Sequence, residues 1–136
     1  MAMLDTTVLI DLRRRPGSPH YVRADAATRR AIDRGEPLCT SRINEAEFRV
    51  GGLRSADPAG EQAGIDSLLS TLVMLEFDTA AARRYAEARA YQLDIGRPAG
   101  QADVFVAAVA LANGQTLITR NPKHFADVPG LTVESY

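Results

Sequence analysis

The chain has 136 residues, of which 46% are hydrophobic and 24% charged, with a formal charge of −1. This composition is that of an ordinary globular domain and excludes disordered and fibrous classes, and the near-neutral charge means that any nucleic-acid binding would need a local basic patch. The single cysteine, Cys39, excludes an internal disulfide, and with only two histidines it cannot complete a zinc site, so any metal would be bound through oxygen.

No apolar stretch is long enough to cross a membrane. The longest run, 104–112, falls well short of the roughly 18 to 20 residues that a bilayer requires. The first residues lack a basic leader, and Asp11 interrupts the apolar stretch that follows them. We therefore expect a cytoplasmic protein that forms one domain over residues 1–136.

The hydrophobic pattern alternates between strand and helix along the chain. Strands are expected at 1–4, 37–40, 72–75, 116–119 and 131–133, and helices at 8–13, 21–34, 41–53, 59–71, 79–93 and 101–113. Such alternation predicts an α/β fold with a mainly parallel sheet flanked by helices, in which sites form beyond the carboxyl ends of the strands.

Asp103 is the only charged residue between Arg97 and Arg120, and it begins the most apolar helix of the chain. A carboxylate there is costly to bury unless a cation, a metal or hydrogen bonds compensate it, which indicates a functional site. An acid in the first turn of a helix is also stabilised by the helix dipole. The local pattern does not choose between these interpretations.

Asp5 directly follows the first expected strand, so its side chain would lie at the mouth of the crevice, with the hydroxyls of Thr6 and Thr7 beside it. An Asp before an apolar helix is equally typical of an N-cap. Only the other carboxylates favour a role in a site.

The helix over 41–53 contains two acids, Glu45 and Glu47, about 200° apart on its circumference, so only one can face a shared pocket. Glu47 is expected on the inward face that Ile43, Ala46 and Val50 would form, whereas Glu45 would face outward and pair with Arg49 at i+4. We therefore assign Glu47 to the site.

Two polar residues come from the end of the strand 116–119. Thr119 could orient a carboxylate or a water, and Asn121 projects from the same strand end, although both residues also suit a structural turn. His124 is interpreted as a surface or packing residue, because no second histidine or cysteine is placed to bind a metal with it.

Four segments in this order resemble the PIN-domain ribonucleases, and in length and motif order the chain is similar to the VapC-type toxins of toxin–antitoxin pairs. The segments are residues 4–11 (LDTTVLID), 46–51 (AEFRVG), 102–108 (ADVFVAA) and 117–131, which contains LITRNPKHF. The resemblance spans nearly the whole chain and implies a PIN-like three-layer fold around a sheet of four to five strands.

The resemblance also implies roles for individual residues. Asp5, Glu47 and Asp103 match the metal-binding acids of the family, Thr6 and Thr119 its supporting hydroxyl positions, and Asn121 a fourth position that is often acidic. It further implies an RNA substrate, a homodimer and a VapB-type antitoxin that blocks the site. An acidic site of this kind selects Mg²⁺ or Mn²⁺, and we expect a metal-dependent endoribonuclease.

Two alternatives differ from this assignment. A phosphatase of the haloacid dehalogenase type also begins with an acid after an apolar strand, but its second aspartate should stand where this chain has Thr7. A catalytically inactive PIN-like module that binds only RNA or protein would share the fold. The presence of all three acids argues against that module.

Overall fold

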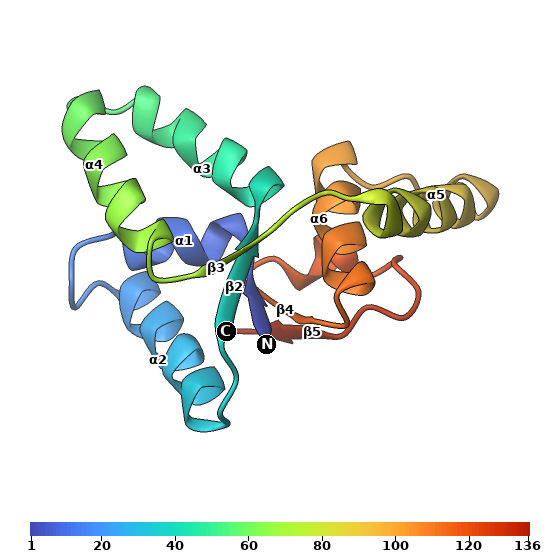
Figure 1. Ribbon diagram of the computed structural model, residues 1–136, viewed down its shortest axis with the longest axis horizontal. Coiled ribbons are helices and arrows are strands. Elements are labelled where there is room, and N and C mark those ends of the chain that lie inside the picture. Colours follow the sequence, from blue (N-terminus) through green and yellow to red (C-terminus); the bar gives the residue numbers. More distant parts are fainter.

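The computed structural model describes all of residues 1–136, which form five strands, six α-helices and one 3₁₀ turn (Figure 1). The elements in chain order are β1 (Ala2–Leu4), α1 (Thr6–Leu12), α2 (Pro19–Asp33), β2 (Leu38–Ser41), α3 (Arg42–Leu53), α4 (Pro58–Leu69), β3 (Val73–Leu75), α5 (Thr79–Asp94), α6 (Gln101–Ala112), β4 (Thr116–Thr119), η1 (Pro122–Phe125) and β5 (Val133–Ser135). None of these helices combines the length and hydrophobicity that crossing a bilayer requires.

The sheet has the strand order β3-β2-β1-β4-β5, and every neighbouring pair is parallel. The expected α/β fold is therefore confirmed. The chain first proceeds from β1 outward to β2 and β3, then returns through α5 and α6 to place β4 on the other side of β1. The direction of winding thus reverses between β1 and β4, and in parallel sheets a ligand crevice opens beyond the carboxyl ends of strands at such a point.

Two hydrophobic clusters cover the two faces of the sheet. Ala2 and Leu4 of β1 pack with α1 to α4 on one face, while Met3 between them packs with α5 and α6 on the other. This alternation follows from the two-residue period of a strand. Figure 1 shows the same separation, with α1 to α4 on one side of the sheet and α5 and α6 on the other. The molecule is accordingly built in three layers.

Most element boundaries lie close to those expected. The helix expected at 79–93 begins at Thr79 after the N-cap Asp78, whose carboxylate accepts the N–H of Ala81 at 2.9 Å. The last strand was placed too early: β5 spans 133–135, not 131–133, because its pairing with β4 sets Val133 opposite Leu117. Its polar Glu134 and Ser135 obscured the strand in the sequence. The 3₁₀ turn η1 was not expected.

Neighbouring glycines in α3 provide a test of packing between α3 and α4. Gly51 is exposed and a Cβ there would meet nothing within 4 Å, whereas a Cβ on the buried Gly52 would lie 2.7 Å from Cδ1 of the buried Ile65. We expect Gly51→Ala to raise the free energy of unfolding by about 1 kcal/mol through helix propensity. Gly52→Ala should lower it by about 1 kcal/mol through overpacking. Urea unfolding of both variants measures this difference, and equal effects would contradict the packing described.

Candidate active site

Polar side chains gather where the central strands end. Asp5 directly follows β1, and Thr119 is the last residue of β4. The first turn of α6 supplies Asp103, and the middle of α3 supplies Glu47. The elements of both helical layers thus contribute carboxylates to the same end of the sheet.

Asp5 is 6% exposed, and its carboxylate is held entirely by side chains. Oδ1 accepts a hydrogen bond from Asn44 Nδ2 at 3.2 Å, while Oδ2 accepts from the hydroxyls of Thr119 at 2.6 Å and Thr7 at 3.2 Å. Asp5 does stand at the N-cap position of α1, but its side chain makes no capping hydrogen bond. The capping interpretation of this carboxylate is therefore wrong.

Asn44, which the sequence reasoning did not single out, orients two residues of the site. It is fully buried, and its Nδ2 donates to Asp5 and, at 3.0 Å, to Thr6 Oγ1. The Ser41 hydroxyl donates to Asn44 Oδ1 at 2.5 Å and accepts the Asn44 N–H at 3.2 Å, so the amide group cannot turn over freely. The signal in the sequence was a polar residue on the apolar face of α3, three residues after the cap Ser41.

Glu47 is connected to this network through Thr6, whose hydroxyl donates to Oε2 at 2.7 Å. Burial raises the pKa of Glu47, the hydrogen bond from Thr6 opposes this rise, and the negative charges of Asp5 and Asp103 raise the pKa further. The charges of both other acids therefore repel the Glu47 carboxylate, although it forms a hydrogen bond with neither of them.

Glu45 forms the expected ion pair with Arg49, but the face of α3 expected to point inward is wrong. Glu45 pairs with Arg49, as expected, and with Arg42, and these arginines lower its pKa. However, Ala46 and Val50 are exposed, and the buried residues of α3 are Asn44, Phe48 and Gly52. The reason is that α3 lies between two clusters: Ile43 packs against one and Phe48 belongs to the other. Glu47 lies between these two faces.

Asp103 is partly buried in the first turn of α6. Burial raises its pKa, the nearby His124 lowers it, and the charge of Asp5 raises it. The Nδ1 atom of His124 lies 3.5 Å from Oδ2 of Asp103, and its side chain is 55% exposed. The surface interpretation of His124 is confirmed, but the residue also contacts one of the three acids.

The two remaining predicted residues behave differently. Thr119 holds Asp5, as described above, whereas the side chain of Asn121 forms no hydrogen bond. The backbone N–H of Asn121 instead donates to Thr119 Oγ1 at 3.1 Å. Asn121 thus contacts the site through its main chain.

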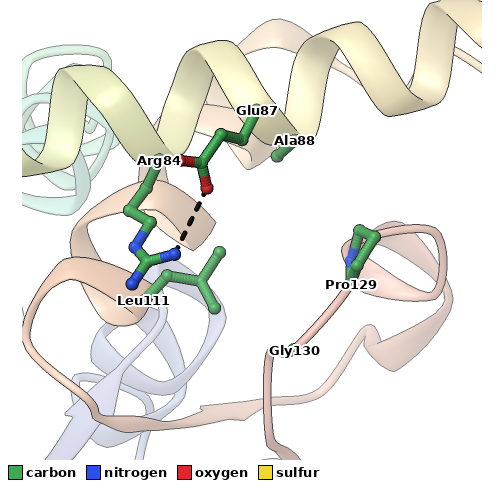
Figure 2. Close-up of a pocket in the computed structure, with 6 residues that line it drawn as sticks. All are labelled: Arg84, Glu87, Ala88, Leu111, Pro129 and Gly130. Atoms are coloured by element: carbon green, nitrogen blue, oxygen red, sulfur yellow. Dashed lines mark hydrogen bonds and ion pairs between the residues drawn. The ribbon is translucent and has the colours of Figure 1, made fainter.

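A pocket of about 490 Å³ opens beside Asp103. Its lining includes the basic residues Arg97 and Lys123, together with His124 and the acid Asp127. A different pocket, of about 360 Å³ and shown in Figure 2, lies between α5, the C-terminal turn of α6 and the 129–130 turn. It contains the Arg84–Glu87 ion pair and is at the opposite end of α6 from Asp103, so it is separate from the acids.

The donor atoms at this edge of the sheet are suited to one kind of metal ion. No three acidic, histidine or cysteine side chains converge closely enough to form a closed metal site. The available donors are carboxylate oxygens supported by hydroxyl and amide groups, which are the chemistry that Mg²⁺ and Mn²⁺ prefer. In their donor chemistry, the residues fit a hard divalent cation.

Known proteins show the same architecture. The PIN domain family matches residues 2–131. The tRNA(fMet)-specific endonuclease VapC of Shigella flexneri is 30% identical over 135 residues, covering 98% of this chain and 96% of that protein. A crystal structure of VapBC2 from Rickettsia felis, bound to a DNA fragment from its promoter, matches with a TM-score of 0.85 at 25% identity, covering 99% of this chain and 98% of that one.

A further solved structure is VapBC-5 from Mycobacterium tuberculosis, a member of the VapBC family of toxin–antitoxin systems. It matches with a TM-score of 0.68 at 26% identity over 98% of this chain and 95% of that one. The chain therefore belongs to the PIN-domain family. The similarity to proteins named VapC extends over almost the full length of the chain, and membership of the PIN family excludes the phosphatase alternative.

The opposite pKa shifts of Glu47 and Glu45 predict opposite pH effects on stability in the metal-free protein. Because the pKa of Glu47 is raised, Glu47 stabilises the folded state at low pH, and this stabilisation is lost as pH rises through the folded-state pKa. Because the pKa of Glu45 is lowered, Glu45 stabilises the folded state at neutral pH, and this stabilisation is lost as pH falls through the folded-state pKa.

On going from about pH 4 to about pH 7, the melting temperature of Glu47→Gln should therefore rise relative to that of the wild type. The melting temperature of Glu45→Gln should fall relative to that of the wild type over the same range. Thermal melts in chelator at both pH values provide the measurement. Parallel shifts in the two variants would show that Glu47 does not have the buried, repelled environment described.

Proposed function

We propose that this protein hydrolyses phosphodiester bonds of RNA, with Asp5, Glu47 and Asp103 as ligands of Mg²⁺ or Mn²⁺. The observation that carries the proposal is the placement of three carboxylates at one end of the sheet, two of them with raised pKa values. Groups in mutual repulsion at a strand-end crevice are typical of a site that a cation completes. The endonuclease name of the Shigella relative supports the reaction class.

When bound, the divalent cation would neutralise substrate phosphate and favour attack by water. The residues of this chain prepare that chemistry in distinct ways. Asn44, Thr7 and Thr119 hold Asp5 in one orientation, and Thr6 holds Oε2 of Glu47. Oε1 of Glu47 accepts no hydrogen bond within the chain, so it is the oxygen that we assign to accept the proton of the attacking water.

RNA would reach the acids past positively charged groups. Arg97 and Lys123 line the pocket beside Asp103 and can offset the repulsion between an acidic site and phosphate. Many arginines of the first half of the chain are held in ion pairs, for example Arg13 with Glu61 and Arg49 with Asp66, and Arg97 also lies 3.8 Å from Asp127. We assign this activity to the cytoplasm, where RNA is available.

Single substitutions of the three acids test the proposal. Asp5→Asn, Glu47→Gln and Asp103→Asn should each lower the rate of RNA cleavage at saturating Mn²⁺ by more than about 100-fold, because loss of a ligand exceeds the usual 10- to 100-fold cost of losing a group that supports one. Glu45→Gln, whose carboxylate pairs with arginines on the same helix, should retain activity within about twofold.

Cleavage of mixed RNA by the four variants, with chelator, Mg²⁺ or Mn²⁺, is the measurement, and circular dichroism verifies folding. Metal-independent cleavage by the wild type would overturn the metal assignment. No cleavage under any condition, with intact RNA binding, would favour the inactive binding module.

We further propose that the protein forms a homodimer and that a VapB-type antitoxin binds over the acids. The solved VapBC proteins of similar fold support such a partner. The product of an adjacent short gene should co-purify with the chain, and the complex should cleave RNA at least about tenfold more slowly than the freed chain, since a basic partner side chain can occupy the acidic site. Light scattering measures the oligomeric state. Equal rates for complex and free chain would overturn occlusion.

A further inference from the structure

A second buried acid, Asp11, lies in the last turn of α1 and has no exposed surface. Its Oδ1 accepts hydrogen bonds from Arg14 Nε at 2.7 Å and Arg120 Nη1 at 2.9 Å. Its Oδ2 accepts from the same Arg120 nitrogen at 3.1 Å and from the Tyr136 hydroxyl at 2.9 Å. A buried carboxylate is stable only when it is paired in this way. None of these side chains belongs to the proposed metal site.

Arg120 connects this cluster to the site through its main chain. Its backbone N–H donates to Thr7 Oγ1 at 3.1 Å, and the next N–H, of Asn121, donates to Thr119 Oγ1 at 3.1 Å. A hydroxyl has one proton, so a threonine that accepts an amide hydrogen directs its own proton elsewhere. Both hydroxyls point to Oδ2 of Asp5. The two amides therefore restrict the threonines to donating to Asp5 or to each other, since Thr7 Oγ1 and Thr119 Oγ1 lie 3.4 Å apart.

The Arg120 side chain fixes the position of those amides. The segment after β4 leaves the sheet, and its ion pair with Asp11 attaches it to α1, the helix that also carries Thr7. Asp11 is thus linked to Asp5 through Arg120, the turn and two hydroxyls. If the side-chain pair is lost, the turn can move and the hydroxyls no longer have one fixed orientation.

We propose that Asp11 and Arg120 are positioning residues that set the affinity of the Asp5 site for a divalent cation. The inference rests on the proposed function, because it takes Asp5 to be a metal ligand. Residues that orient ligands through hydrogen bonds typically change metal affinity about 10- to 100-fold when lost. This role differs from a purely structural one, which would change the stability of the fold and leave the affinity for metal unchanged.

Arg14 supplies a matched control. It pairs with the same carboxylate as Arg120, at a similar distance, but it directly follows the C-cap of α1, three residues after Asp11, and its side chain makes no other hydrogen bond. Arg14→Gln removes one cation from Asp11 and leaves the attachment of the turn intact. Asp11→Asn removes the charge that holds Arg120. The two substitutions separate general weakening of the cluster from release of the turn.

The experiment measures Mn²⁺ binding to the full-length, metal-free protein by titration calorimetry, alongside thermal melts in chelator. We expect the Kd for Mn²⁺ to rise about tenfold in Asp11→Asn and to change less than about twofold in Arg14→Gln. In RNA cleavage, Asp11→Asn should need about tenfold more Mn²⁺ for half-maximal rate, while kcat at saturating Mn²⁺ stays within about threefold of wild type.

A second pair of variants keeps the test decisive where Asp11→Asn does not fold. Arg120→Lys retains the charge and the backbone amide, and should raise the Kd less than Arg120→Gln does. An unchanged Kd in Asp11→Asn, or equal weakening in Asp11→Asn and Arg14→Gln, overturns the positioning role and leaves the proposed function intact. Absence of Mn²⁺ binding in the wild type overturns the proposed function and this inference with it.

Discussion

The arrangement of the site depends on one buried carboxylate, that of Asp5, at the point where the sheet reverses its winding. A charge with so little contact with water must be compensated by the chain, and three side-chain donors from α1, α3 and β4 surround it. Each donor is held in turn by a further group, such as Ser41 behind Asn44. Much of the polar interior near the strand ends follows from this requirement, because an unsatisfied donor or acceptor there would itself be costly.

The positions of Asp5 and Thr119 could be predicted from the sequence because a parallel sheet places its strand ends together, whatever the details of packing. Which face of α3 is buried could not be predicted in this way, because a single apolar stripe does not describe a helix that contacts two hydrophobic clusters. Asn44 was overlooked because its burial is explained by its hydrogen bonds to Asp5 and Thr6, which only the tertiary fold brings beside it.

The Asp11–Arg120 pair shows a second limit of sequence reasoning. The two residues are separated by 109 positions, and each has an ordinary local interpretation, one at a helix end and the other after a strand. Pairing between such distant charges is a property of the tertiary fold alone. The same holds for β5, whose place is set by its register with β4 and not by its own polar sequence. Local propensity determines elements well and their partners poorly.

The three acids also come from opposite sides of the sheet. Glu47 belongs to the layer of α1 to α4, and Asp103 to the layer of α5 and α6, while Asp5 directly follows the central strand β1 between them. The separation of Glu47 from Asp103 therefore depends on how the two helical layers are seated on the sheet. A ligand that held both carboxylates would therefore link the two helical layers to each other at this edge of the sheet.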